Sequence, residues 1–231
     1  MRIDPHEFLK IVRPALEAGD PARLAEEVCQ RWTPRQLCEL LRHADADIRR
    51  VTAVTIGLVG DDTCIGCLIR ALHDADEGVN QMAEHGLWAI WFRSGQPAAA
   101  KPFSEGVSLL CQEKYAEAMA KFERAIRLDP EFAEAFNQCA IAHFFMGQWE
   151  ASIEDCRRAL ALMPSHFGAM SGMGHCHTHL GNLDEALRCY RESVRINPRM
   201  TAIADAIERL EANMGNRNDS SGMFEATGLR R

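Results

Sequence analysis

The sequence predicts an all-α fold, an α-solenoid in which helical hairpins stack on one another. A motif repeats every 34 residues, and Pro130, Pro164 and Pro198 mark its phase. Between these prolines, small and bulky residues also recur at matching positions. A period of this length is typical of a supersecondary unit that buries its apolar face against a neighbouring copy, and therefore of a stacked array.

Each unit contains two helices, as judged by the spacing of its apolar residues. Residues 132–146 and 149–162 carry apolar side chains at helical intervals, which predicts two helices in the central unit. Gly147 and Gly181 follow the first helix of their units, where a left-handed residue commonly ends a helix. The proline of each unit ends the second helix, because it lacks an N–H and disfavours helical backbone in the preceding residue.

This pattern resembles the tetratricopeptide (TPR) repeat family over residues 101–200. The resemblance rests on one set of small residues, one set of bulky residues and the proline stop. The small set includes Ala118, Ser152 and Ala186, and the bulky set is Phe122, Cys156 and Tyr190. The family implies three helical pairs with a concave inner surface, and an amphipathic helix ending near residue 214 would cap the stack. Three residues depart from the family: Pro102, where the family usually has a large aromatic residue, and Ser152 and Cys156 in the middle unit.

The first 93 residues also predict helices. Asp4, Asp20 and Thr33 each precede a proline, which predicts capped helices near residues 5–18, 21–31 and 34–43. From residue 33 a second motif repeats at an offset of 31 residues, and over about 33–93 it resembles two HEAT repeats of the short bacterial type. In that family an arginine at the start of the second helix pairs with acidic turns. Arg49 matches this position and Asn80 does not.

These patterns divide the chain into four parts. Residues 1–93 form the N-terminal helices and the HEAT-like repeats, and residues 94–100, which contain Gly95 and Pro97, form a joint. Residues 101–214 form the three TPR units and the capping helix. Residues 215–231 are rich in Gly, Asn and Ser, and we expect a disordered tail there.

Composition argues against several classes of partner. The net charge is −7, without a cluster of Lys and Arg that could neutralise phosphates, so we expect no nucleic-acid partner. No apolar run approaches the roughly 18 residues of a membrane span, so we expect no membrane partner. Nine cysteines are scattered along helical faces, which favours buried thiols in a reduced cytoplasm over a disulfide framework. Cys64 and Cys67, a lone CxxC pair, should then be two thiols.

In TPR arrays the first helices of the units line the concave surface, and the resemblance implies a peptide-binding groove there. The positions that would face it are Phe103, Val107, Leu110, Glu134, Asn137, Ile141, Phe144, Phe145, Ser171, His175, Thr178 and His179. These side chains are mostly apolar in the first two units and polar in the third. We therefore expect an amphipathic helix or an extended peptide to dock by apolar anchors. The alternative is that the aromatic residues pack inside the molecule.

One TPR subgroup grips acidic chaperone tails with Lys, Arg and Asn side chains in this groove. The corresponding positions here hold Phe103, Val107, Gln138, Gly168 and Gly172. The sequence therefore argues against a carboxylate clamp.

A histidine cluster offers a second kind of chemistry. His175 and His179 share one helix face at a spacing that can present two imidazoles to a metal ion, and Glu134 is the one acidic residue placed near them in the groove. We interpret the pair as the polar end of a peptide groove, and a metal site serving a metal-binding or catalytic accessory protein is the alternative.

No phosphate-binding loop, dinucleotide fingerprint or nucleophile elbow is present in the sequence, so we expect a non-enzyme without a cofactor. The predicted function is a cytoplasmic adaptor or scaffold that binds a protein or peptide. Self-association is a further expectation, because the groove could accept Met223 and Phe224 from the tail of the same chain or of a neighbour.

Overall fold

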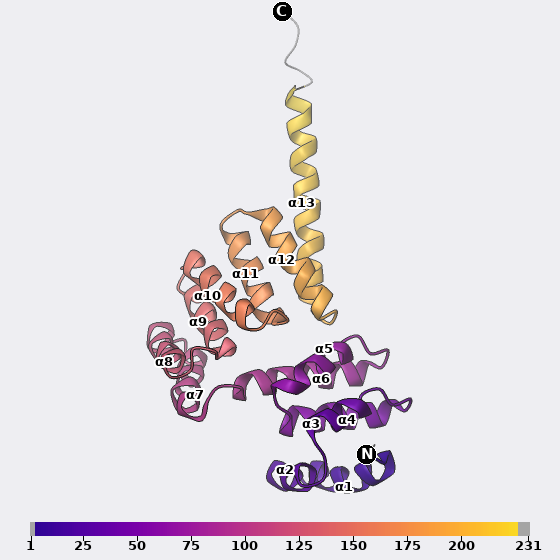
Figure 1. Cartoon of the computed structure of the whole chain (residues 1–231). Helices are drawn as coiled ribbons and strands as arrows, with labels where there is room; N and C mark the ends of the chain where they lie inside the picture. Colours follow the sequence, from indigo (N-terminus) through magenta and orange to yellow (C-terminus); the bar gives the residue numbers. More distant parts are fainter. Residues whose placement is uncertain (1–2, 226–231) are drawn as a thin grey trace, which may run out of the picture.

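The computed structural model describes residues 3–225, with side chains as far as Met214. These residues form thirteen α-helices and one short 3-10 helix, and no strand occurs among them (Figure 1). The all-α prediction is confirmed. In the N-terminal half the helices are α1 (Pro5–Glu17), α2 (Pro21–Cys29), α3 (Pro34–Leu40), α4 (Ala46–Val59), α5 (Ile65–Ala71) and α6 (Glu77–Arg93). In the C-terminal half they are α7 (Pro97–Cys111), α8 (Tyr115–Leu128), α9 (Ala133–Phe145), α10 (Trp149–Leu162), α11 (Phe167–His179), α12 (Leu183–Ile196) and α13 (Thr201–Glu225).

The first three helices begin where the sequence places their caps. The Asp4 carboxylate accepts hydrogen bonds from the backbone N–H groups of His6 and Glu7, at 2.8 and 3.3 Å. The Asp20 carboxylate accepts one from Arg23 N–H. Because these contacts lie within three residues of the cap, they form wherever this local sequence becomes helical.

Three helical pairs, α7/α8, α9/α10 and α11/α12, stack in an arch (Figure 1). Gly147 and Gly181 end the first helices of the second and third pairs with φ of 72° and 76°, as the sequence predicts. Gly174 allows α11 to approach α12, since a Cβ at this position would lie 2.5 Å from the ring of Tyr190. The small and bulky positions of the repeat therefore pack against each other inside one pair.

The N-terminal half contains two further pairs, α3/α4 and α5/α6. Arg49 at the start of α4 donates to both carboxylate oxygens of Asp74, at 2.8 and 2.7 Å, and so ties the first pair to the turn of the second. Asn80, at the matching position of α6, instead accepts a hydrogen bond from Arg199 of the C-terminal half at 2.9 Å. An arginine at position 80 would face the cation of Arg199. The HEAT-like assignment of residues 33–93 remains a prediction.

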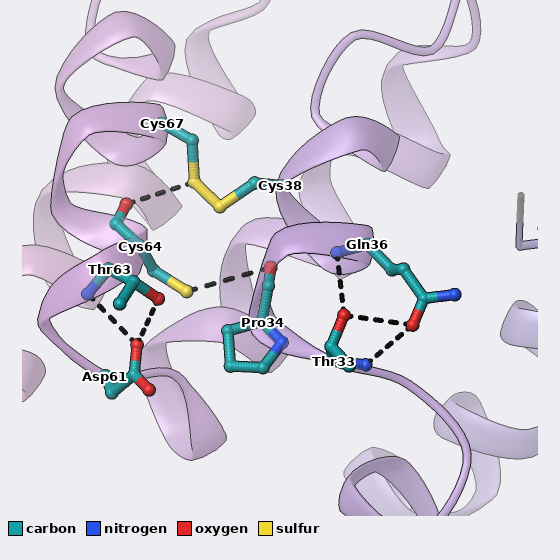
Figure 2. The surroundings of a disulfide bond; sticks show 8 residues. All are labelled: Thr33, Pro34, Gln36, Cys38, Asp61, Thr63, Cys64 and Cys67. Atoms are coloured by element: carbon teal, nitrogen blue, oxygen red, sulfur yellow. Dashed lines mark hydrogen bonds between the residues drawn. A yellow bond between two sulfur atoms is a disulfide. The ribbon is translucent and has the colours of Figure 1, made fainter. Parts of the chain in front are cut away.

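Two of the nine cysteines form a disulfide, which corrects the expectation of free thiols. Cys38 of α3 is bonded to Cys67 of α5 across a Cα–Cα distance of 5.7 Å (Figure 2). These residues are 29 positions apart in the sequence, and only the stacking of the two pairs brings them together. Cys64, the other member of the CxxC pair, is a buried free thiol.

Helix α6 runs along the corners where one TPR unit passes into the next. Trp91 stacks on His166 with the ring centroids 4.2 Å apart. One turn earlier, the Trp88 ring meets the same corner, edge-on to Phe167 at 5.4 Å. Two turns earlier, Glu84 meets the corner between α12 and α13, where it accepts hydrogen bonds from the side chains of Asn197 and Arg199 at 3.0 and 3.3 Å. The two halves therefore share one core, and α7 begins at Pro97, within the predicted joint.

The capping helix is longer than expected. Ile203, Ile207 and Leu210 of α13 belong to one apolar cluster with Tyr190 of α12, as the predicted cap requires. The helix then continues to Glu225 and projects beyond α12 (Figure 1), whereas a disordered tail from residue 215 is the sequence-based expectation. A glycine inside a helix costs only about 1 kcal/mol, so Gly215 does not end it. Residues 226–231 lie outside the described part of the chain. No described helix is long and apolar enough to cross a membrane.

Candidate peptide groove

A cavity of about 210 Å³ opens between the second and third TPR units. Its walls come from α9, α10 and α11. The lining residues are Asn137, Ala140, Ile141, Phe144, Phe145, Ser152, Cys156, Gly168, Gly172 and His175. Five of these, Asn137, Ile141, Phe144, Phe145 and His175, are among the predicted groove positions.

The cavity exists because α11 carries glycine where it faces α9 and α10. A Cβ added at Gly172 would lie 3.7 Å from Cys156 Sγ, which is ordinary van der Waals contact, so the site has room for a side chain that is not there. At Gly168 a Cβ would lie 2.5 Å from the indole of Trp88, so this glycine is required by the approach of α6. In the sequence, Gly168 and Gly172 indicate only that the side chains of a carboxylate clamp are missing. Their spacing of four residues, which places both on one face of a helix, is the sequence feature that could have indicated a cavity.

Aromatic side chains form one rim of the cavity. The ring of Phe144 lies 5.1 Å from Trp149 and 5.4 Å from His179, and Trp149 stacks on His179 at 4.2 Å. Phe145 is 57% exposed, the largest value among the exposed large apolar residues that the structure describes, and stacks on Tyr115. Large apolar side chains held at the surface beside a cavity are typical of a binding site.

His175 is held in one orientation by Tyr190. The Tyr190 hydroxyl lies 2.7 Å from His175 Nδ1. The Thr178 hydroxyl donates to the carbonyl of Gly174 and also lies 3.2 Å from the Tyr190 hydroxyl. The single Tyr190 proton can therefore go to Thr178 Oγ1 or to His175 Nδ1, and the tautomer of His175 follows that choice. Burial, with a smaller contribution from His179, lowers the pKa of His175. At neutral pH the residue that lines this edge of the cavity is therefore a neutral imidazole.

The histidine pair does not gather a metal-ligand set. No group of three His, Cys, Asp or Glu side chains that could hold a metal ion occurs among the described residues. Glu134, the acidic candidate from the sequence, is fully buried and bonded elsewhere. The ring of His179 is stacked against Trp149 at an interplanar angle of 8°.

Three predicted groove residues, Phe103, Glu134 and Ser171, are buried and do not line the cavity, which corrects their assignment. Phe103 is 4% exposed and packs against the rings of Phe92 and Phe132 at 5.6 and 4.6 Å. Glu134 is 0% exposed. Phe103 is covered in part by Phe92 of α6, which no repeat pattern places there. Glu134 is instead enclosed by its hydrogen-bond partners Asn137, Gln138 and His166. Here the alternative of internal packing holds.

Ser171 and the remaining predicted positions divide between the core and the edges of the groove. Val107 and Leu110 are partly buried and pack on the core of the first unit. Ser171 is buried and its hydroxyl donates to the Gly168 carbonyl. Thr178 is half-buried beside Tyr190.

Glu134 does not face the cavity but holds one of its lining residues, Asn137, in place. Its Oε1 accepts hydrogen bonds from Asn137 Nδ2 at 3.1 Å and Gln138 Nε2 at 2.6 Å. Its Oε2 lies 2.7 Å from His166 Nε2. His166 Nδ1 accepts the backbone N–H of Ala169 at 3.1 Å, so the proton on Nε2 is the one that faces Glu134. This network fixes Asn137, whose side chain lines the cavity.

The lining contains neither Lys nor Arg. A carboxylate bound in the cavity would therefore meet no cationic side chain, and bringing a charge out of water without a partner is costly. An apolar side chain would lose only its contact with water, which is favourable.

Comparisons with known proteins identify the repeat. A tetratricopeptide-repeat family profile matches residues 131–199, and a second TPR-repeat profile matches residues 108–147. A TPR repeat-containing protein of Rhizobium etli is 34% identical over 92 residues, which is 40% of this chain and 43% of that protein. The Hsp70-Hsp90 organizing protein 1 of Glycine max is 26% identical over 117 residues, which is 50% of this chain and 20% of that protein. The chain thus spans less than half the length of these curated relatives.

Solved structures agree on the fold of the C-terminal half. The Sgt2 TPR domain of Aspergillus fumigatus superposes with a TM-score of 0.51 at 20% identity, over 54% of this chain and 84% of that one. The first TPR domain of Spaghetti (RPAP3), bound to the HSP90 peptide SRMEEVD, superposes with a TM-score of 0.50 at 23% identity, over 51% of this chain and 94% of that one. Residues 108–199 of this chain are therefore tetratricopeptide repeats.

Proposed function

We propose that this chain is an adaptor or scaffold that binds a protein or peptide in the groove of its TPR units. The observation that carries the proposal is the apolar cavity between α9 and α11, which is bordered by exposed aromatic rings. A structural neighbour with the same arrangement of helices binds the HSP90 peptide SRMEEVD, which supports a peptide as the class of ligand. The cavity is the anchor of the proposed site.

The chemistry of the cavity favours a different peptide from that of this neighbour. The peptide SRMEEVD ends in acidic residues, and the cavity of this chain offers no Lys or Arg to them. A volume of about 210 Å³ has room for one side chain of the size of Leu, Met or Phe. We propose that one such side chain enters the cavity, while the side chains of Asn137 and His175 form hydrogen bonds with the peptide backbone.

Filling the cavity tests this function. Peptides selected from a random display library for binding to the full chain would be measured against two variants at one position, Gly172→Leu and Gly172→Ala. The leucine side chain occupies the cavity, whereas the alanine methyl makes ordinary contact with Cys156. We expect Gly172→Leu to weaken binding at least tenfold and Gly172→Ala to change it little, with both variants melting near the parent. Equal binding by the parent and a folded Gly172→Leu variant would contradict the proposed site.

Three finer predictions remain proposals. The HEAT-like repeats of residues 33–93 would serve as a support that holds α6 against the TPR corners. Self-association through the C-terminal residues is tested below. A cytoplasmic location is expected because the scattered cysteines favour free thiols in a reducing compartment. The Cys38–Cys67 disulfide weakens this expectation, because disulfides are rare in such a compartment.

A further inference from the structure

Two aromatic side chains of α6 remain partly exposed beside the TPR units. Phe92 is 38% exposed, although its ring lies 5.6 Å from the buried ring of Phe103. Trp88 is half-buried and lies 6.4 Å from Phe92. Both residues belong to the N-terminal half, and neither lines the cavity described above. An apolar pair held at the surface next to a groove suggests an additional contact for a ligand.

The cavity and this pair adjoin each other at Gly168. Gly168 lines the cavity, and a Cβ on it would lie 2.5 Å from the Trp88 ring. Trp88 therefore borders the cavity across a residue that has no side chain. From Trp88 the apolar surface continues to Phe92 one turn later on the same helix.

The Trp88 ring is also held rigidly. It lies edge-on to Trp91, His166 and Phe167, with centroid distances of 5.1, 5.7 and 5.4 Å. A ring already fixed by its neighbours loses little conformational freedom when a ligand binds, which favours affinity.

We infer that the ligand groove extends from the cavity over Trp88 to Phe92, so that the N-terminal half supplies a second apolar subsite. The occupant is an uncharged segment of another protein with two large apolar side chains, one in the cavity and one on the Trp88–Phe92 pair. The inference rests on the proposed function, since the cavity is its first subsite. It makes recognition depend on both halves of the chain.

The described part of the C-terminal helix leads away from this groove. The first residues of α13 lie near α6, where Arg199 contacts Glu84, and the helix points away from α6 (Figure 1). Its twenty-five residues extend about 36 Å. The C-terminal segment of a second copy stays as a competing occupant, and the experiment distinguishes it.

The test uses synthetic peptides of Ser, Gly and Asn that carry either one Leu or a Leu and a Phe at varied separations. Binding to the full chain is measured by fluorescence anisotropy. We expect some separations of the two-anchor peptide to bind at least tenfold more tightly than the one-anchor peptide. Phe92→Ala should remove most of this gain and leave the one-anchor affinity unchanged. Leu58→Ala, which truncates another exposed apolar residue (44% exposed) on α4, is the matched control and should have no effect.

The outcomes separate the inference from the function beneath it. If Gly172→Leu abolishes binding but a folded Phe92→Ala variant keeps the full gain, the extension to α6 is wrong and the cavity stands. If Gly172→Leu also has no effect, both are wrong. A peptide of residues 215–231 is added as a competitor. If it binds more tightly than every two-anchor peptide and displaces them, the occupant is a second copy of this chain and the inferred partner is overturned.

Discussion

Glu134 should be among the most sensitive positions in this protein, because it is a buried carboxylate that serves three donors. Asn137, Gln138 and His166 all direct N–H groups at it, and both it and His166 are 0% exposed. Glu134 on α9 binds His166, which lies just before α11, and the ring of His166 in turn stacks on Trp91 of α6. Replacing it should therefore affect the contact between the two halves as well as the floor of the cavity.

The size of the effect follows from what each substitution leaves behind. Glu134→Ala leaves three buried donors without an acceptor, and at about 1–3 kcal/mol for each unsatisfied donor the loss is at least about 3 kcal/mol. Since 1 kcal/mol shifts the Tm of a chain of this size by about 2–4 °C, Tm should fall by roughly 6 °C or more. Glu134→Gln keeps an oxygen for two donors but turns an NH₂ group toward His166 Nε2–H. It should lose one hydrogen bond to a charged group, about 1.5–3 kcal/mol.

Thermal unfolding followed by circular dichroism measures both variants, and a double-mutant cycle with His166→Phe tests the cause. Phenylalanine can still stack on Trp91 and has no donor, so His166→Phe should cost less in the Glu134→Gln background than in the parent. Loss of the Ala169 cap occurs in both backgrounds and cancels. A Tm change below 2 °C for Glu134→Ala, or an equal cost of His166→Phe in both backgrounds, would refute the reasoning.

Three further predictions concern stability. Gly174→Ala should lower Tm clearly, by a clash costing about 1–3 kcal/mol, because its Cβ would lie 2.5 Å from the Tyr190 ring; thermal unfolding measures this. Burial raises the pKa of Asp155 from 3.8 to about 6, so its ionised form destabilises the fold at neutral pH, and this penalty disappears as pH falls from about 6 toward 4. Asp155→Asn should therefore stabilise the protein at pH 7.5, by on the order of 2 kcal/mol after screening, and have little effect at pH 4, as measured by urea unfolding at both values. Because the Cys38–Cys67 disulfide closes a loop of 29 residues, reducing it should cost about 2–4 kcal/mol, and the Cys38→Ser variant should unfold at the same temperature with and without reductant.

Each of these predictions has a contradicting result. An unchanged Tm for Gly174→Ala would mean that α11 and α12 lie farther apart than described. A stabilisation by Asp155→Asn that is equal at both pH values would mean that its carboxylate is not desolvated. Nine reactive thiols in unfolded, unreduced protein, in place of the seven free cysteines, would rule out the disulfide.

Local features of the fold are readable in the sequence. The caps at Asp4 and Asp20 and the left-handed glycines at 147 and 181 are set by neighbours within a few residues. The stacking of α7–α12 follows from the 34-residue repeat, since each unit can bury its apolar face only against the next. The exposure of Phe145 and the lining of the cavity by Ile141 and Phe144 follow from the same register.

The candidate site is only partly readable in this way. Phe103 and Glu134 occupy groove positions in the repeat, yet both are buried, Phe103 against Phe92 of α6 and Glu134 among its hydrogen-bond partners. The cavity arises from Gly168 and Gly172. From the sequence these glycines indicate only that clamp side chains are absent, and they do not reveal that a cavity forms there. The CxxC motif likewise pairs Cys67 with Cys64, whereas the disulfide joins Cys67 to Cys38.

The amino-acid sequence by itself determined the helices, their pairing and their order, because capping, left-handed turns and repeat packing act between near neighbours along the chain. Tertiary structure alone decided how α6 lies across the TPR corners, and with it the contact that helps to bury Phe103. Trp91 and His166 are 75 positions apart, and Glu84 and Arg199 are 115 apart. Contacts at such separations depend on the summed geometry of all the intervening units, which no single repeat encodes.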